Sequence, residues 1–167
     1  MNDFIDKIGF KRYLRKESYV ICDDDKNFNL DALKKAIDKD FPPLERKNNR
    51  RYKVIYCYSL IEGVFQYPAK ASNVLYIGKS RSEITNNKIS LSYRFKHCKD
   101  GNDSKSNYCL RYYYKNKIPL LLEIYEIGNR GCIDKIESKL RNAFIRDFSS
   151  YPIADGASFK KSVNNMR

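Results

Sequence analysis

The stretches YKVIYCYSL, residues 52–60, and VLYIGK, residues 74–79, decide the fold of this 167-residue chain. Both are rich in β-branched and aromatic residues, which favour strands, and a turn near Glu62-Gly63 follows the first. They predict a β-hairpin with a long connecting loop. A third strand is predicted at residues 119–127, where a leucine-rich apolar run follows a proline.

Helices are predicted between and after these strands. Residues 82–90 are polar and rich in Asn, which indicates a loop, and helices are expected at 91–98 and 107–117. The clearest amphipathic helix spans residues 133–148. Its apolar residues recur every four positions: Ile136, Leu140, Phe144 and Phe148. The pattern predicts an α+β domain over residues 52–167.

Residues 1–51 are predicted to form an N-terminal α/β extension. Tyr19-Val20-Ile21-Cys22 favours a short strand, and residues 30–37 favour a helix. Pro42-Pro43 and the basic run at 46–51 then indicate a linker. We expect the extension to serve target recognition, dimer contacts or packing.

The charge points to a polyanionic partner. The chain has 33 Lys and Arg against 20 Asp and Glu, a net charge of +13, and nucleic acid is the expected partner for such a surplus. Tyrosines lie among the basic clusters and suit a phosphate-binding surface, although at helical spacing they also suit a core. The residues expected to contact nucleic acid are Arg46, Lys47, Arg50, Arg51, Arg81, Lys96, Arg111 and Lys115.

Other classes of protein are disfavoured. No apolar run reaches the roughly 18 to 20 residues that span a bilayer, and the first residues lack the pattern of a secretory signal. We therefore expect a cytoplasmic protein without a membrane partner. Five scattered Cys with no C-x-x-C pair favour buried thiols over a disulfide framework or a zinc site.

Two tripeptides carry a family resemblance: Val54-Ile55-Tyr56 on the first predicted strand and Tyr76-Ile77-Gly78 on the second. With the order of elements that follows, the chain resembles the GIY-YIG nuclease superfamily over about residues 52–156. Val54 stands where that family usually has Gly. The resemblance implies a small three-stranded antiparallel sheet flanked by helices. It also implies cleavage of nucleic-acid phosphodiesters with one divalent metal.

The resemblance also implies a set of site residues. Arg94, with His97 on the same predicted helix, matches the family's Arg after the second strand. Glu137, near the start of the last helix, matches the metal-binding Glu and would hold Mg²⁺ or Mn²⁺. Lys79 matches a Lys found in the bacterial repair branch. Pro152 stands where the family usually has Asn, within a stretch that is similar to phage intron homing nucleases.

These residue types suit phosphodiester hydrolysis. A carboxylate such as Glu137 can hold Mg²⁺, and Arg94 can bind two phosphate oxygens as charge develops. Nearby cations would favour the phenolate of Tyr56, the expected general base, while Tyr76 would orient the water or bind phosphate. Each residue also has a structural explanation: Tyr56 as a packed ring, and Glu137 as a first-turn carboxylate that complements the helix dipole.

Three hypotheses follow. The first is a free-standing endonuclease of restriction, defence or mobile-element type, acting on DNA, with RNA left open. The second is a catalytically decayed GIY-YIG-fold protein that binds nucleic acid, motivated by Val54 and Pro152. The third is a basic interaction module unrelated to the family. A double-strand cut from one site per chain would need two visits or a homodimer.

Overall fold

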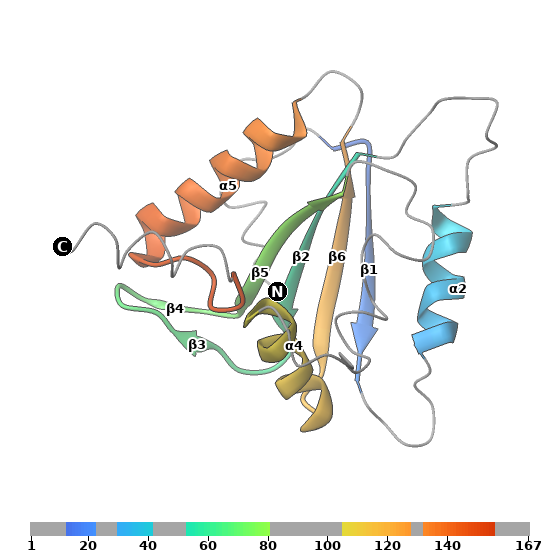
Figure 1. Ribbon diagram of the computed structural model, residues 1–167, viewed down its shortest axis with the longest axis horizontal. Helices are drawn as coiled ribbons and strands as arrows, with labels where there is room; N and C mark the ends of the chain where they lie inside the picture. The colour runs from blue at the N-terminus through green and yellow to red at the C-terminus, as the bar shows by residue number, and fades with distance from the viewer. Residues whose placement is uncertain (1–12, 23–29, 42–52, 81–104, 128–131, 156–167) are drawn as a thin grey trace.

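The computed structural model describes residues 13–22, 30–41, 53–80, 105–127 and 132–155 (Figure 1). Their elements, in chain order, are β1 (Arg15–Ile21), α2 (Leu30–Asp40), β2 (Val54–Leu60), β3 (Phe65–Gln66), β4 (Ala71–Ser72), β5 (Val74–Ser80), α4 (Lys105–Lys115), β6 (Leu120–Glu126) and α5 (Ile133–Phe148). The chain is thus a mixed α and β protein. The predicted strands and the helices near 30–37, 107–117 and 133–148 are confirmed. The helix expected at 91–98 lies outside the described residues.

The main sheet has four strands, in the order β1-β6-β2-β5, and all neighbours are antiparallel. This corrects the expected three-stranded sheet. The fourth strand, β1, comes from the N-terminal region and pairs with β6 from Arg15 opposite Glu126 to Ile21 opposite Leu120. An ion pair between Arg15 Nε and Glu126 Oε2, 2.8 Å apart, supports this register. Without β1, the apolar strand β6 would be an open edge.

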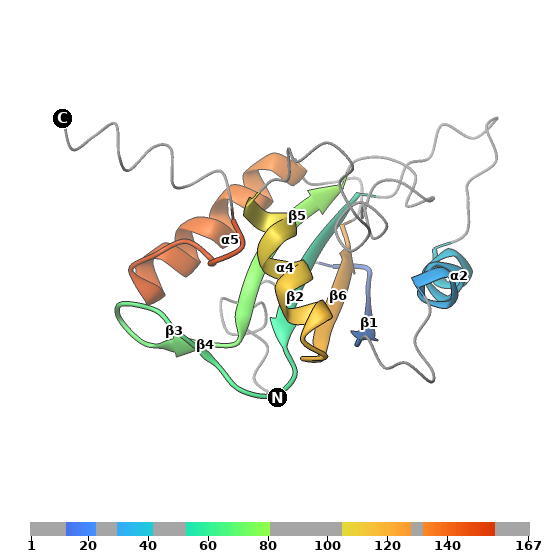
Figure 2. The same ribbon diagram turned by 60° about the horizontal axis from the view of Figure 1, so that its bottom comes forward.

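The sheet is covered on both faces. Side chains alternate between the faces of a strand, so β2 sends Tyr56 and Tyr58 one way and Ile55 and Cys57 the other. The first face packs against apolar residues of α2 and α4. The second packs against α5. Figure 2 shows α4 and α5 on opposite sides of β5 and β2. The two-sided burial explains why all seven residues of β2 are buried.

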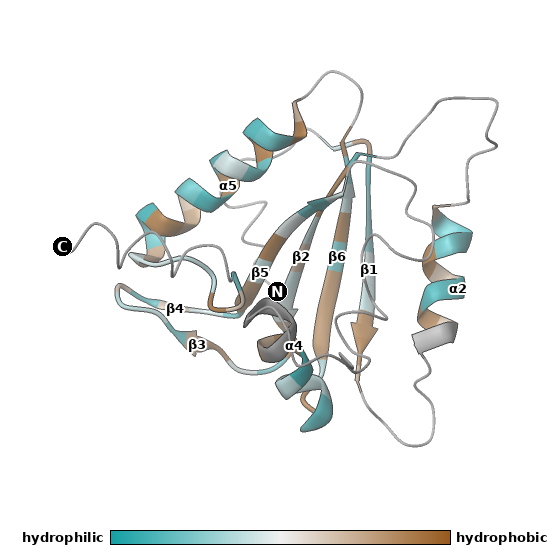
Figure 3. Cartoon of the chain, viewed as in Figure 1, coloured by the Kyte–Doolittle hydropathy of each residue, from teal (hydrophilic) through white to brown (hydrophobic). Residues whose placement is uncertain are grey.

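Helix α5 forms because its apolar residues share one face. Ile133, Leu140, Phe144 and Phe148 are buried at successive spacings of seven, four and four, and one acidic residue, Glu137, is buried with them. Figure 3 shows this alternation of hydrophobic and hydrophilic segments along α5, beside the mostly hydrophobic central strands. No helix in the described ranges has the length and apolar character needed to cross a bilayer. The helix ends at Phe148, and the next residue, Ser149, caps it with a positive φ of 56°, after which the chain turns back toward β5.

The segment after α5 runs along β5, which is an edge strand of the main sheet. The Ala154 amide donates to the Leu75 carbonyl at 2.9 Å. Tyr67 adds a second tie, because its hydroxyl donates to the Val74 carbonyl at 2.6 Å and accepts from the Ile153 amide at 3.1 Å. These bonds fix residues 149–155 beside β5 and bring the last described residue, Asp155, next to α5.

Candidate active site

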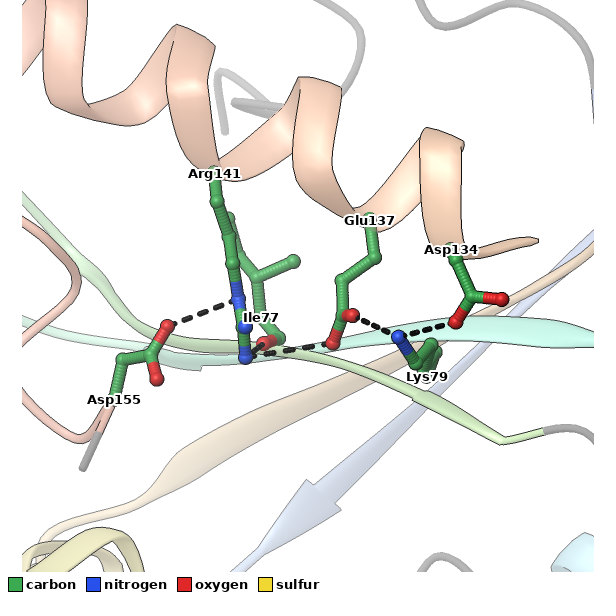
Figure 4. A network of polar contacts seen from close by, with 6 residues as sticks. All are labelled: Ile77, Lys79, Asp134, Glu137, Arg141 and Asp155. Atoms are coloured by element: carbon green, nitrogen blue, oxygen red, sulfur yellow. Dashed lines mark hydrogen bonds and ion pairs between the residues drawn. The ribbon is translucent and has the colours of Figure 1, made fainter. Parts of the chain in front are cut away.

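An ionic cluster lies between β5 and α5 (Figure 4). At its centre is Lys79 on β5, whose ammonium lies 2.5 Å from Glu137 Oε2 and 2.6 Å from Asp134 Oδ1. Glu137 is the more buried of the two carboxylates, with 9% of its side chain exposed against 41% for Asp134. The two sequence-predicted residues Lys79 and Glu137 therefore meet directly, although they lie far apart in the chain.

Arg141 extends this cluster toward the C-terminal segment. Its Nη2 lies 3.4 Å from Glu137 Oε1 and donates to the Ile77 carbonyl on β5 at 3.3 Å. Its Nε forms an ion pair, rather than a hydrogen bond, with Asp155 Oδ2 at 2.9 Å. Figure 4 shows the resulting chain of charges, from Asp155 through Arg141 and Glu137 to Lys79 and Asp134.

The local sequence explains why these side chains converge. Asp134, Glu137 and Arg141 are three and four residues apart, so they share one face of α5. Lys79 lies two residues after the buried Ile77 and therefore leaves β5 on the same side, toward α5. The cluster thus follows from helix and strand periodicity once α5 packs on β5.

The cluster has the donor chemistry of a site for a hard divalent cation. One oxygen of Glu137 and one of Asp134 converge on a single position, where the Lys79 ammonium lies. Carboxylate oxygens are the ligands that Mg²⁺ prefers, often with only one or two from the protein. No group of three or more His, Cys, Asp or Glu able to hold a metal occurs in the described part of the chain. A metal here would thus keep most of its ligands as water or substrate.

A cluster of three tyrosines occupies the other face of β5 and β2. The ring of Tyr56 lies 5.9 Å from that of Tyr76 and 6.0 Å from that of Tyr58, measured between centroids. Tyr56 is 4% exposed, whereas Tyr76 is only partly buried. Gly78 lies against both rings: a Cβ at this position would fall 2.5 Å from Tyr76 Cε1 and 2.6 Å from Tyr56 Cζ.

The predicted site residues are thus found in two groups, which lie on opposite faces of β5. Tyr56 and Tyr76 meet beside Gly78 on the α4 face, and Lys79 and Glu137 meet on the α5 face. Arg94 and His97 lie outside the described residues. So do most of the residues expected to contact nucleic acid: Arg46, Lys47, Arg50, Arg51, Arg81 and Lys96.

The two remaining candidates for nucleic-acid contact lie on α4 and differ in exposure. Lys115, in the last turn, is exposed, as a phosphate contact requires. Arg111 is only 9% exposed, which leaves little of its guanidinium for a phosphate.

Sequence reasoning missed three members of the ionic cluster: Asp134, Arg141 and Asp155. The first two carried a usable signal, because charged residues at a spacing of three and four around Glu137 predict neighbours on one helix face. Asp155 carried none, since only the packing of its segment against β5 brings it to Arg141. Pro152, at the position where the resemblance expects Asn, is buried and accepts a hydrogen bond from the Asp155 amide at 2.8 Å.

Burial disfavours thiol chemistry at Cys109, which lies on α4 and packs against the core. Desolvation raises the pKa of its thiol to about 11, so the thiol stays protonated near neutral pH. Burial likewise raises the pKa of Tyr67, whose phenol is tied to Val74 and Ile153. Neither group is available as a nucleophile or base near pH 7.

No protein-family model, curated protein or solved structure matches this chain.

Proposed function

We propose that this protein is a divalent-metal-dependent endonuclease that hydrolyses nucleic-acid phosphodiester bonds, with DNA as the expected substrate. The observation that carries the proposal is the direct contact of Lys79 with the buried Glu137 on the α5 face of the sheet. The pair of Tyr56 and Tyr76 lies on the opposite face of the same two strands, β2 and β5. Tyr56, Tyr76, Lys79 and Glu137 are among the residues on which the resemblance to GIY-YIG nucleases rests, together with Arg94. The net charge of +13 supplies the attraction for a polyanion.

Glu137 would hold Mg²⁺ or Mn²⁺, with Asp134 as a second carboxylate on the same helix face. The ion, when bound, supplies charge neutralisation at the phosphate and lowers the pKa of a water molecule. Lys79 would leave its position between the carboxylates and bind a nonbridging phosphate oxygen, as a flexible ammonium can. In the proposed site Arg94 stabilises developing charge on the phosphate, and His97 assists it.

A tyrosine would take the proton from the attacking water. The resemblance suggests Tyr56 for this role. The greater exposure of Tyr76 is a reason to test that residue as well. Tyr56 is 4% exposed, so little room remains for water at its ring, whereas Tyr76 is partly exposed. A base that passes its proton to solvent needs such access. The two phenols are close enough for one to orient water for the other.

A nucleic-acid-binding protein with a decayed site is the second candidate. Pro152 favours it, because a buried proline replaces the polar Asn that the resemblance expects. The pairing of Glu137 with two cations also favours it, since both cations compete with a metal. Retention of Tyr56, Tyr76 and Glu137 favours the enzyme.

A plasmid-nicking assay separates the two candidates. Supercoiled plasmid is incubated with the protein in Mg²⁺, Mn²⁺ or EDTA, and labelled RNA is treated in parallel. The endonuclease predicts nicked or linear plasmid with metal and none with EDTA. A mobility shift without cleavage in either metal would establish the binding protein. Cleavage of RNA but not of plasmid would show that the substrate is RNA and not DNA.

A further inference from the structure

Asp155 is the most deeply buried charge of the ionic cluster. Only 3% of its side chain is exposed, and a buried carboxylate is costly unless a cation compensates it. Arg141 is the cation that the structure places against it, with Nε 2.9 Å from Oδ2. The pair joins the segment after α5 to the middle of α5.

Arg141 distributes its donors over three elements. Nε faces Asp155, while Nη2 reaches both the Ile77 carbonyl at 3.3 Å and Glu137 Oε1 at 3.4 Å. An ion pair between residues four apart on an exposed helix holds its side chains only weakly. Here the Arg141 guanidinium also contacts Asp155 and the Ile77 carbonyl of β5. These two groups, which do not belong to α5, therefore fix its orientation toward Glu137.

The two oxygens of Glu137 consequently face different cations. Oε1 is directed to Arg141, and Oε2 is directed to Lys79. We propose that Arg141 and Asp155 are positioning residues, which hold the Glu137 carboxylate so that Oε2 is presented to the metal. This inference rests on the proposed metal-dependent function.

Fastening of the C-terminal segment does not explain the buried charge of Asp155. The Ala154 amide already bonds to Leu75, and the Ile153 amide already bonds to Tyr67. Both bonds are made by the backbone of the segment and need no carboxylate at position 155. The side chain of Asp155 pairs with Arg141, which in turn contacts Glu137.

The test is the affinity for Mn²⁺, measured by titration calorimetry on the full chain. Asp155→Asn keeps the size of the side chain and removes its charge. We expect Mn²⁺ affinity to fall roughly 10- to 100-fold, the usual effect of losing a residue that orients a metal ligand. DNA affinity without metal should not change, and a higher Mn²⁺ concentration should restore the cleavage rate. If Asp155 only stabilised the fold, the folded variant would bind Mn²⁺ with the parental affinity, and a higher Mn²⁺ concentration would not change its cleavage rate.

Asp147→Asn is the matched control. Asp147 also lies on α5 and pairs with an arginine, the 73% exposed Arg146, but it is not part of the cluster. We expect parental Mn²⁺ affinity. Should Asp155→Asn fail to fold by circular dichroism, Arg141→Lys decides the question, because it keeps a cation but cannot reach Asp155, Ile77 and Glu137 together.

The outcomes separate this inference from the proposed function. A parental protein that binds Mn²⁺ and cleaves DNA, with unchanged Mn²⁺ affinity in folded Asp155→Asn or Arg141→Lys, would overturn the positioning role alone. A parental protein that neither binds Mn²⁺ nor cleaves nucleic acid would overturn the proposed function, and this inference with it.

Discussion

Gly78 on β5 lies directly opposite Tyr56 on β2, and the Tyr56 ring fills the space that a side chain at position 78 would occupy. A Cβ there would lie 2.6 Å from Tyr56 Cζ, closer than real Cβ contacts come. The glycine is therefore needed for space and not for an unusual backbone angle. Because Gly78 has no side chain, two tyrosines can pack over β5, on the face opposite to that of Lys79.

Gly78→Ala should displace the tyrosine pair. The new methyl group would meet Tyr56 and Tyr76, and Tyr56 is packed in the core, so the rings cannot both move away freely. Overpacking of this kind costs about 1 to 3 kcal/mol in the free energy of unfolding. Urea denaturation measures the loss. Unchanged stability would show that the rings make room, contrary to the close packing of Gly78 against them.

Phenylalanine at each tyrosine separates a catalytic phenol from a packed ring. A general base contributes roughly 10²–10⁴-fold to the rate, so removing its hydroxyl should slow single-turnover cleavage by that factor. We expect the larger loss for Tyr76→Phe, because Tyr76 is the more exposed, and a small change in melting temperature. Parental rates in both variants would contradict a tyrosine base, and a dead His97→Ala variant would then transfer the role to His97.

The core strands and α5 could be predicted because their apolar residues are continuous or recur every four positions. The pairing of β1 with β6 could not. Pairing between strands uses backbone groups that every residue has, so the short pattern around Tyr19 gives no partner and no register. The sequence therefore predicts an N-terminal extension without showing that its strand, β1, joins the main sheet.

Tyr67→Phe should loosen the segment that carries Asp155. The phenol bridges the Val74 carbonyl and the Ile153 amide, and leaving the buried Val74 carbonyl without this partner costs about 1 to 3 kcal/mol. We expect a lower melting temperature and, through Asp155, weaker Mn²⁺ binding. A variant as stable as the parent would show that the bridge does not hold the segment.

The same phenol predicts how stability depends on alkaline pH. Burial raises the pKa of Tyr67 above its ordinary value near 10. Its contribution to stability is therefore complete below about pH 10 and is lost as the pH rises toward the folded value. Melting curves recorded from about pH 9 to about pH 11 should show a smaller decline in stability for Tyr67→Phe than for the parent. Equal declines would contradict the assignment.

Affinity for DNA should fall steeply with salt, because binding releases counterions from the phosphates. A fluorescence-anisotropy titration without metal gives the slope of log K against log salt concentration. Lys115→Ala should reduce that slope by about one, because the exposed Lys115 is expected to contact a phosphate. A slope near zero for the parental protein would contradict the nucleic-acid partner.

The candidate site could be predicted only in part. Lys79 and Glu137 were found by resemblance, and their contact supports the choice. The spacing of Arg141 from Glu137 predicts that the two share a helix face, but it does not predict their contacts with β5. Asp155 becomes a neighbour of Arg141 only because Tyr67 and Leu75 hold its segment against β5. Such tertiary contacts have no local pattern.

The central claim is that Glu137 holds the metal that cleaves nucleic acid, and single-turnover plasmid cleavage in Mg²⁺ by Glu137→Gln tests it most directly. Glu123→Gln is the matched control, because Glu123 is equally buried and pairs with Lys16, at 2.6 Å, on the far strand β1. We predict a loss on the order of 10³-fold for Glu137→Gln, the equivalent of several kcal/mol of metal-ion stabilisation. DNA affinity should be unchanged, and Glu123→Gln should cleave at the parental rate. Parental cleavage by folded Glu137→Gln would contradict the account.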